Sequence, residues 1–274
     1  MSRNAITITP VTPVIGAHVD GIDLGNLSNP EFGVLYDGLM AHGALFFRDQ
    51  DISIESQKLL GQRFGKLVAH PNDPGVAGHP EVMPIHADEN SVRATGEEWH
   101  SDVSCDPLPP MGSIVRLHTV PETGGDTLFA CMYAAYEALS ERMRALLDGL
   151  RAVHDGAPYY QRVNRLLDRD DGGRAYPRAE HPVIRTHPVT GRKALFVNKL
   201  FTQYIVGVPT GEGRALLDFL FDHASRPHFQ CRFRWRRNSV AMWDNRCTQH
   251  HAIWDYWPAT RSGYRVTIQG EKPE

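Results

Sequence analysis

The stretch Glu98-Trp99-His100-Ser101-Asp102-Val103-Ser104 constrains the fold more than any other part of the chain. It places one imidazole and one carboxylate two residues apart, and on an extended chain residues i and i+2 project from the same face. Both side chains could then reach one metal ion. A further ligand must come from elsewhere, so the fold has to bring a remote segment against this one.

The remote segment is Trp243-Asp244-Asn245-Arg246-Cys247-Thr248-Gln249-His250-His251, near the C-terminus. Strand pairing must bring two such distant segments together, and a barrel or jelly roll does this readily. Adjacent histidines on a strand face opposite ways, so one of His250 and His251 points at the metal and the other points away. Spacing alone does not choose between them.

Two histidines and one carboxylate on one face of an octahedral ferrous ion leave three adjacent positions open, which suits a bidentate oxoacid and O2. Downstream, the alternation in residues 261–267 puts Arg261 and Arg265 on a common strand face. A guanidinium is a planar fork that matches a carboxylate, so this pair could hold two different anions beside the metal. In the alternative interpretation, His100 and Asp102 are a chance surface pair and the arginines are solvated.

The composition indicates one soluble globular domain over residues 1–274. Lys and Arg number 29 against 32 Asp and Glu, and the net charge of −3 gives no general attraction to nucleic acid or an anionic membrane. No stretch of about 18 apolar residues occurs, and the N-terminus lacks the pattern of a signal peptide. We therefore expect a full-length cytoplasmic protein. The cysteines form no C-x-x-C pair, which argues against a thiolate zinc site or a disulfide scaffold: Cys105, Cys131, Cys231 and Cys247.

Local patterns predict a mostly β protein with flanking helices, and the 24 Gly and 19 Pro imply many turns. The expected elements, in order, are a strand pair within residues 5–27, a helix capped by Ser28 and ending near residue 41, a buried strand over 43–48, a helix capped by Ser53 with Leu59, Leu60 and Phe64 on one side, strands over 114–117 and 126–129, a helix over 132–150 with Ser140 as a candidate internal cap, strands over 182–185 and 194–197, and a helix over 210–223.

Residues 155–181 are polar and turn-rich, which predicts an active-site lid or a mobile insertion, with a disordered surface loop as the alternative. Further on, apolar residues alternate with arginines, which predicts a strand with one apolar and one cationic face: Cys231, Arg232, Phe233, Arg234, Trp235 and Arg236. Because the chain is acidic overall, we favour a solvated outer face over a nucleic-acid-binding stripe.

Four motifs in this order together resemble the taurine/2,4-D dioxygenase (TauD/TfdA) family over nearly the whole chain: Trp99-His100-Ser101-Asp102, Gly124-Gly125-Asp126-Thr127, Trp243-Asp244-Asn245-Arg246 with Thr248-Gln249-His250, and residues 261–267. The resemblance implies a double-stranded β-helix core, a cupin-like jelly roll, flanked by helices. It implies Fe(II) as the metal, with 2-oxoglutarate and O2 as co-substrates. It also selects His250, which follows Thr-Gln, as the ligand that joins His100 and Asp102.

The resemblance further implies which residues bind the two organic molecules. Thr127 and Arg261 match the residues that bind 2-oxoglutarate. The matches to the substrate pocket are His70, Val103, Phe201 and Arg265, of which Arg265 pairs with an anionic substrate in several members. Where the taurine enzyme holds taurine with an asparagine and a tyrosine, this chain has Gly96 and Asp73, which argues against taurine itself.

The implied reaction is hydroxylation of a small organic anion, such as a sulfonate, an alkyl sulfate, an aryloxyalkanoate or another carboxylate, with release of succinate and CO2. Members of the family are commonly dimers or tetramers, so a homo-oligomer is expected. His181 and His187 lie in turn or packing contexts outside this site. One alternative is a zinc-type metallohydrolase, but that lacks an evident general base and leaves Thr127 and Arg261 unexplained. The other is a non-catalytic barrel that binds an organic anion.

Overall fold

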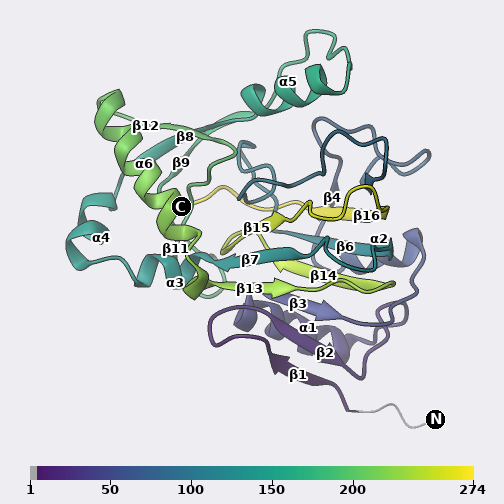
Figure 1. Ribbon diagram of the computed structural model, residues 1–274. Helices are drawn as coiled ribbons and strands as arrows, with labels where there is room; N and C mark the ends of the chain where they lie inside the picture. The colour runs from purple at the N-terminus through teal and green to yellow at the C-terminus, as the bar shows by residue number, and fades with distance from the viewer. Residues whose placement is uncertain (1–4) are drawn as a thin grey trace.

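The computed structural model describes residues 5–274, and facing sheets with helices around them form its centre (Figure 1). The larger sheet has the strand order β1-β2-β3-β14-β6-β16-β4, with β5 also paired to β16. Its strands are β1 (Thr7–Pro10), β2 (Ala17–Asp20), β3 (Ala44–Phe47), β4 (Leu67–Val68), β5 (Val82–Ala87), β6 (Gly112–Thr119), β14 (Ser239–Asp244) and β16 (Arg261–Ile268).

A smaller sheet of order β13-β7-β15 faces it, built from β7 (Thr127–Cys131), β13 (Gln230–Phe233) and β15 (Thr248–Ala252). A further sheet of order β12-β8-β9 lies outside these two sheets (Figure 1). Its strands are β8 (Arg151–Asp155), β9 (Arg178–Pro182) and β12 (Thr202–Ile205). The hairpin of β10 (Ile184–Thr186) and β11 (Lys193–Leu195) completes the described β structure.

Helices cover the outer face and the ends of the sheets (Figure 1). They are α1 (Asn29–His42), α2 (Ile54–Gln62), α3 (Met132–Glu137), α4 (Glu141–Leu147), α5 (Ala157–Leu166) and α6 (Thr210–Ala224), with a short 3-10 turn at Pro227–Phe229. The start of α1 is fixed locally, because the Ser28 hydroxyl accepts from the Glu31 backbone while the Glu31 carboxylate accepts from the Ser28 backbone. Gly43 ends this helix in a left-handed conformation and turns the chain into β3.

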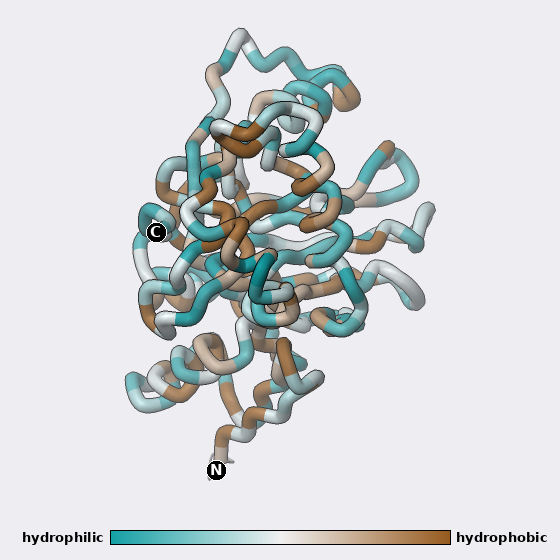
Figure 2. Tube along the Cα trace, turned by 90° about the vertical axis from the view of Figure 1, so that its left-hand side faces the viewer, coloured by the Kyte–Doolittle hydropathy of each residue, from teal (hydrophilic) through white to brown (hydrophobic). Residues whose placement is uncertain are grey.

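Alternating side chains on β3 divide the core into two layers. Phe46 points at the smaller sheet, where its ring stacks on Phe233 at 4.3 Å and lies 5.3 Å from Phe129. Phe47 points the other way and is buried in a cluster with Leu35 and Leu60 of the two covering helices. Burying each such side chain contributes about 1.5–3 kcal/mol, so both faces of the larger sheet are held by apolar packing. Figure 2 shows hydrophobic residues through the middle of the molecule and many hydrophilic ones in the protruding loops.

The structure confirms the opening strand pair, the capped helix before β3 and the strands near 114–117 and 126–129. The strand expected over 182–185 is divided, because β9 ends at Pro182 and β10 begins at Ile184. The strand expected from Cys231 ends at Phe233, although the alternation of buried and exposed residues continues to Arg236. The structure also corrects two details of the helices. The expected helix over 132–150 is broken, because α3 ends at Glu137 and α4 begins after Ser140, whose hydroxyl accepts from the backbone of Met143. Leu59 does not share the buried side of Leu60, since it is 64% exposed. Adjacent residues on a helix point about 100° apart, so only one of these two leucines faces the sheet.

The segment predicted as a lid or a loop contains more regular structure than its composition indicated. Helix α5 occupies residues 157–166 and β9 begins at Arg178, so the irregular part spans 167–177. Figure 1 shows α5 at the top of the molecule, beyond the ends of β8 and β9.

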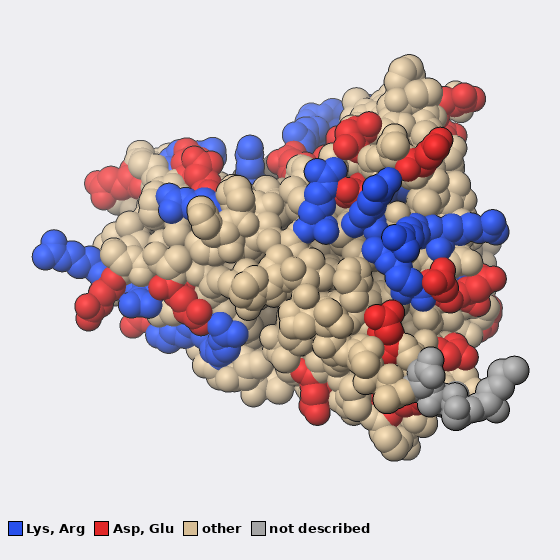
Figure 3. All heavy atoms as spheres, turned by 60° about the horizontal axis from the view of Figure 1, so that its bottom comes forward, with Lys and Arg blue, Asp and Glu red and all other residues tan. Residues whose placement is uncertain are grey.

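No helix among the described residues is long and apolar enough to cross a membrane. On the face of the molecule shown in Figure 3, lysines and arginines gather toward one side with acidic side chains close beside them. Arg232 of β13 is exposed as expected, as are Arg234 and Arg236 just after the strand. Arg232 forms an ion pair of 2.6 Å with Asp126.

Candidate metal and oxoacid site

Two of the expected metal ligands lie opposite each other on neighbouring backbone segments. The His100 N–H donates to the His250 carbonyl over 3.2 Å, and the His250 N–H donates to the His100 carbonyl over 2.9 Å. This isolated antiparallel bridge extends the smaller sheet beyond β15 and brings the two imidazole centroids to 4.1 Å. Side chains of directly opposite residues project from the same face, so both imidazoles point into the same space.

Asp102 lies close to the two histidines, but its backbone is not extended as predicted. The chain turns directly after Ser101, and Val103 has a φ of 45°. This turn brings Asp102 Oδ1 to 3.7 Å from His100 Nε2 and 3.8 Å from His250 Nε2. All three side chains are buried, and their ligand atoms lie within 4.8 Å of one another. The predicted convergence is therefore present, but a turn produces it.

Neighbouring groups fix the orientation of these side chains. The His100 Nδ1–H donates to the Glu98 carbonyl over 2.6 Å, which leaves Nε2 as the lone-pair nitrogen. Ser113 donates to Asp102 Oδ2 over 2.7 Å, so Oδ1 is the oxygen that faces the imidazoles. Asn245 also supports Asp102, because its side-chain oxygen accepts from the Asp102 backbone.

The charge states of Asp102 and His250 suit a divalent cation. Burial alone would raise the pKa of Asp102, but the charge of Arg265 holds it well below its usual range. Burial lowers the pKa of His250 well below its usual value, so this imidazole is neutral. One carboxylate and two imidazoles whose Nε2 atoms lie 3.7 and 3.8 Å from it form a donor set that fits Fe(II), with coordination positions left over.

Arg261 and Thr127 line the same small cavity as the two histidines. Arg261 is only 6% exposed, and its Nε donates to the Gly125 carbonyl over 3.0 Å. The Thr127 hydroxyl lies 3.4 Å from Arg261 Nη2 and accepts from Trp235 Nε1 over 2.9 Å. Within residues 5–274, no carboxylate pairs with Arg261. A buried guanidinium without an acidic partner, facing a cavity, is suited to bind the carboxylate of a ligand.

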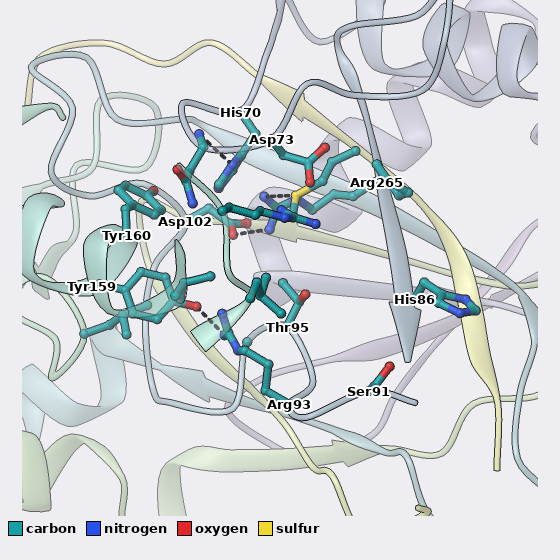
Figure 4. Close-up of a pocket in the computed structure, with 18 of the residues that line it drawn as sticks. His70, Asp73, His86, Ser91, Arg93, Thr95, Asp102, Tyr159, Tyr160 and Arg265 are labelled. Atoms are coloured by element: carbon teal, nitrogen blue, oxygen red, sulfur yellow. Dashed lines mark hydrogen bonds and ion pairs between the residues drawn. The ribbon is translucent and has the colours of Figure 1, made fainter. Parts of the chain in front are cut away.

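A larger cavity of about 370 Å³ is lined by His100 and Asp102, and it shares His100 and Arg265 with the smaller one. Figure 4 shows His70, Asp73 and Arg265 reaching into it near Asp102. Arg265 Nη1 donates to Asp102 Oδ1 over 2.7 Å, so its charge is paired with the same carboxylate oxygen that faces the imidazoles. Burial, followed by the charge of Arg265, lowers the pKa of His70 to about 3. Neutral His70 accepts from the Asn72 N–H at Nδ1, which leaves its Nε2–H as a donor.

Comparison with known proteins identifies the family of this chain. The family described as taurine catabolism dioxygenase TauD, TfdA family, matches residues 7–267. The chain belongs to the TauD/TfdA family. It is 38% identical over 275 residues to a putative alpha-ketoglutarate-dependent sulfonate dioxygenase of Schizosaccharomyces pombe, covering 94% of this chain and 68% of that protein. It is 33% identical over 277 residues to an alpha-ketoglutarate-dependent sulfate ester dioxygenase of Pseudomonas putida, covering 98% and 91%.

Among solved structures, a putative alpha-ketoglutarate-dependent taurine dioxygenase from Burkholderia xenovorans superposes with a TM-score of 0.86 at 36% identity, covering 98% of this chain and 94% of that one. This TauD/TfdA protein is therefore an alpha-ketoglutarate-dependent dioxygenase. The zinc hydrolase and the non-catalytic barrel, both open on the sequence alone, are set aside.

The structure of this TauD/TfdA enzyme also places the other predicted residues. Val103 and Phe201 line the larger cavity with His70, and Asp73 and Gly96 line it as well. His251 points away from the imidazole pair, and its ring stacks on Trp99 at 5.6 Å.

A second buried cluster, His187 with Asp244 and Cys247, lies outside this site. Arg246 donates to both carboxylate oxygens of Asp244, and His187 Nε2 donates to one of them over 3.1 Å. The His187 Nδ1 accepts from the backbone of Val189 and Thr190, so both imidazole nitrogens are occupied. The cluster therefore has the contacts of a structural network rather than of a metal site.

Sequence reasoning missed the residues that support the site from loops. Ser104, two residues after Asp102, hydrogen-bonds His154 over 3.0 Å and accepts from the Asn198 amide over 2.8 Å. The Asn198 side-chain oxygen accepts from the Phe201 backbone, so Asn198 connects the turn at residues 102–104 to a residue that lines the larger cavity. Arg93 and Tyr159 also line that cavity. Neither belongs to a motif, and only the folded path of the chain brings them there.

Proposed function

We propose that this dioxygenase holds Fe(II) with His100, Asp102 and His250, and binds 2-oxoglutarate through Thr127 and Arg261. The observation that carries this assignment is one cavity lined both by the two imidazoles and by the buried Arg261, which pairs with no carboxylate among the described residues. An oxoacid chelates through one end and needs a cation for its distal carboxylate, and this cavity offers both. Bound Fe(II) supplies the redox chemistry that activates O2, and the oxoacid leaves as succinate and CO2.

We propose further that the enzyme hydroxylates a small organic anion in the larger cavity, in the class of sulfonates, alkyl sulfates and aryloxyalkanoates or other carboxylates. Relatives named for sulfonate, sulfate ester and 2,4-dichlorophenoxyacetate chemistry support this class. Arg265 and the Nε2–H of His70 would hold the anion, with Val103 and Phe201 against the rest of the molecule. A cation bound to Asp102 would compete with Arg265 for the same carboxylate, and so would make the guanidinium available to the substrate.

Taurine itself is not the substrate we favour. Gly96 offers no side chain to the cavity, and Asp73 contributes a carboxylate whose oxygen accepts from the Gly75 backbone. The site's main contribution to rate is then positioning, because the reacting C–H must lie next to the metal while the anion is held to one side.

The arrangement of the facing sheets supports a double-stranded β-helix, and we propose that residues 1–274 form one such domain in a homo-oligomeric, cytoplasmic enzyme. In support of a reducing compartment, all four cysteines are buried and free.

The proposal is tested by screening sulfonates, alkyl sulfates and aryloxyalkanoates for succinate formation that depends on ferrous iron and 2-oxoglutarate. Arg265→Ala is the control variant. We expect that this variant loses turnover of the best anion while Fe(II)-loaded enzyme still binds 2-oxoglutarate. Full activity of Arg265→Ala would contradict the anion assignment, and succinate formation without added iron would contradict the metal assignment.

A further inference from the structure

Arg93 is a cation in the wall of the larger cavity that the proposed chemistry leaves unused. It is half-buried, and its Nη2 donates to the Tyr159 hydroxyl over 2.7 Å. The guanidinium also lies 5.4 Å from the centroid of the Tyr159 ring. Figure 4 shows both side chains directed into the cavity, on the side away from His70 and Asp73. Within the described chain, Arg93 forms no ion pair.

The other arginines of this cavity wall are paired or solvated, and none of its carboxylates pairs with Arg93. Arg265 pairs with Asp102, Asp88 lies 3.4 Å from His86 Nε2, and Asp73 accepts from the Gly75 N–H. Arg169 also lines the cavity, but it is exposed in the turn that follows α5. Arg93 is therefore the partly desolvated cation without a counter-charge, and such a group draws anions to itself.

The remaining hydrogen-bonding capacity of the pair suits a carboxylate. A guanidinium carries five N–H donors, and one of those of Arg93 is used by Tyr159. Because the Tyr159 oxygen accepts that bond, its own O–H is left to donate. A planar fork beside a phenol donor matches the two oxygens of a carboxylate.

The position of the pair indicates which part of a substrate it would meet. Arg93 and Tyr159 line both the larger cavity and an outer groove that continues toward Trp254. They therefore stand where the two spaces join, at the opposite side of the cavity from Arg265 (Figure 4). A substrate whose reacting end is held by Arg265 would present its other end here.

We propose that Arg93, with the Tyr159 hydroxyl, binds a second anionic group at the remote end of the substrate, so that this enzyme prefers dianions such as ω-sulfocarboxylates. The inference rests on the proposed function, since it takes the first anion to be held by Arg265. It adds a specificity-determining arginine that none of the sequence motifs contains.

The test compares butanesulfonate, pentanesulfonate and hexanesulfonate with the ω-sulfocarboxylates of the same chain lengths, using Fe(II)-loaded enzyme and succinate formation as the readout. We expect wild-type enzyme to have a higher kcat/KM for the dianion than for the monoanion of at least one length. Arg93→Gln should lower that preference roughly 10- to 100-fold, as expected for a lost hydrogen bond to a charged group, mainly through the KM of the dianion. Arg93→Lys should restore part of it.

Arg169→Gln is the matched control, because it removes the same charge from an exposed position of the same cavity wall, and the preference should stay. Equal loss on both substrate series in Arg93→Gln would assign a merely structural role and overturn the inference, as would equal effects of Arg93→Gln and Arg169→Gln. Wild-type turnover of monoanions without preference for any dianion would overturn the inference while leaving the proposed function intact. Succinate release with neither series would overturn the sulfonate chemistry and the inference with it.

Discussion

Replacing Arg261 by Met gives the sharpest test of the oxoacid end of the site. The Arg261 guanidinium lies over the Trp235 ring, 5.5 Å from its centroid. Methionine is a flexible apolar side chain of similar length, so it can keep packing against Trp235 while removing every guanidinium donor. If Arg261 binds the distal carboxylate of 2-oxoglutarate, the substitution leaves that carboxylate buried opposite an apolar group. Chelation at the other end of the oxoacid would be unaffected.

The magnitude follows from the burial of Arg261. Because the side chain is only 6% exposed, solvent screens its interaction with a bound carboxylate very little. Removing one partner of a buried, hydrogen-bonded charge pair costs about 2–5 kcal/mol. At about 1.4 kcal/mol per tenfold change, the dissociation constant of 2-oxoglutarate should rise from about 30-fold to several thousand-fold.

Anaerobic calorimetric titration of the Fe(II)-loaded enzyme measures this constant without knowledge of the substrate. The matched ligand is 2-oxovalerate, which lacks the distal carboxylate. Wild-type enzyme should strongly prefer 2-oxoglutarate, and Arg261→Met should bind both oxoacids similarly. Arg234→Gln, which removes an exposed arginine just after β13, should behave as wild type. A folded Arg261→Met enzyme that still binds 2-oxoglutarate with wild-type affinity would refute the assignment.

Three further outcomes are expected. Ser113→Ala removes the donor to Asp102 Oδ2 and should weaken Fe(II) binding roughly 10- to 100-fold in equilibrium dialysis, and unchanged affinity would mean that Asp102 needs no such support. Gly125→Ala places a Cβ 3.1–3.3 Å from neighbouring side chains, Arg261 among them, at a φ of 71° and should weaken 2-oxoglutarate binding, whereas Gly149→Ala, with a φ of 75° and open space, should lose only stability. Burial lowers the pKa of His154 to about 3, so the unfolded chain binds more protons than the folded one between that pH and about 6.5, and stability should fall as pH falls through this window. Urea unfolding at pH 5 and pH 7 checks this sign, and His154→Gln should reduce the difference.

Local rules predicted the parts of the fold that local interactions determine. The capping box at Ser28 and the apolar-cationic alternation from Cys231 to Arg236 both act over a few residues, and both appear in the structure. The break between α3 and α4 was harder to predict. Residues 132–150 are helix-forming in composition, and only the cap at Ser140 signalled a new start.

The candidate site divides in the same way. The spacing of His100 and Asp102 predicted that they share a site, although the assumed extended path at Asp102 was wrong. The residues alone left His250 and His251 open, and only the family resemblance chose His250. Arg93 and Tyr159 were not found, since an arginine in a loop and a tyrosine in a helix become neighbours only through tertiary packing. Supporting groups such as Asn198 carry no distinctive pattern in sequence for the same reason.

His100 and His250 face each other across a backbone bridge, so the distance between these two candidate ligands is set by the spacing of paired strands. The relative position of these two ligands would depend on main-chain hydrogen bonds, so the sequences of the surrounding loops could change without altering it. Such an arrangement is sensitive to strand register. Deleting one residue from β15 ahead of His250 would turn the His250 imidazole outward and the His251 imidazole inward. A chain altered in this way would lose Thr248 or Gln249 from the motif and would present His251 instead of His250 to His100 and Asp102.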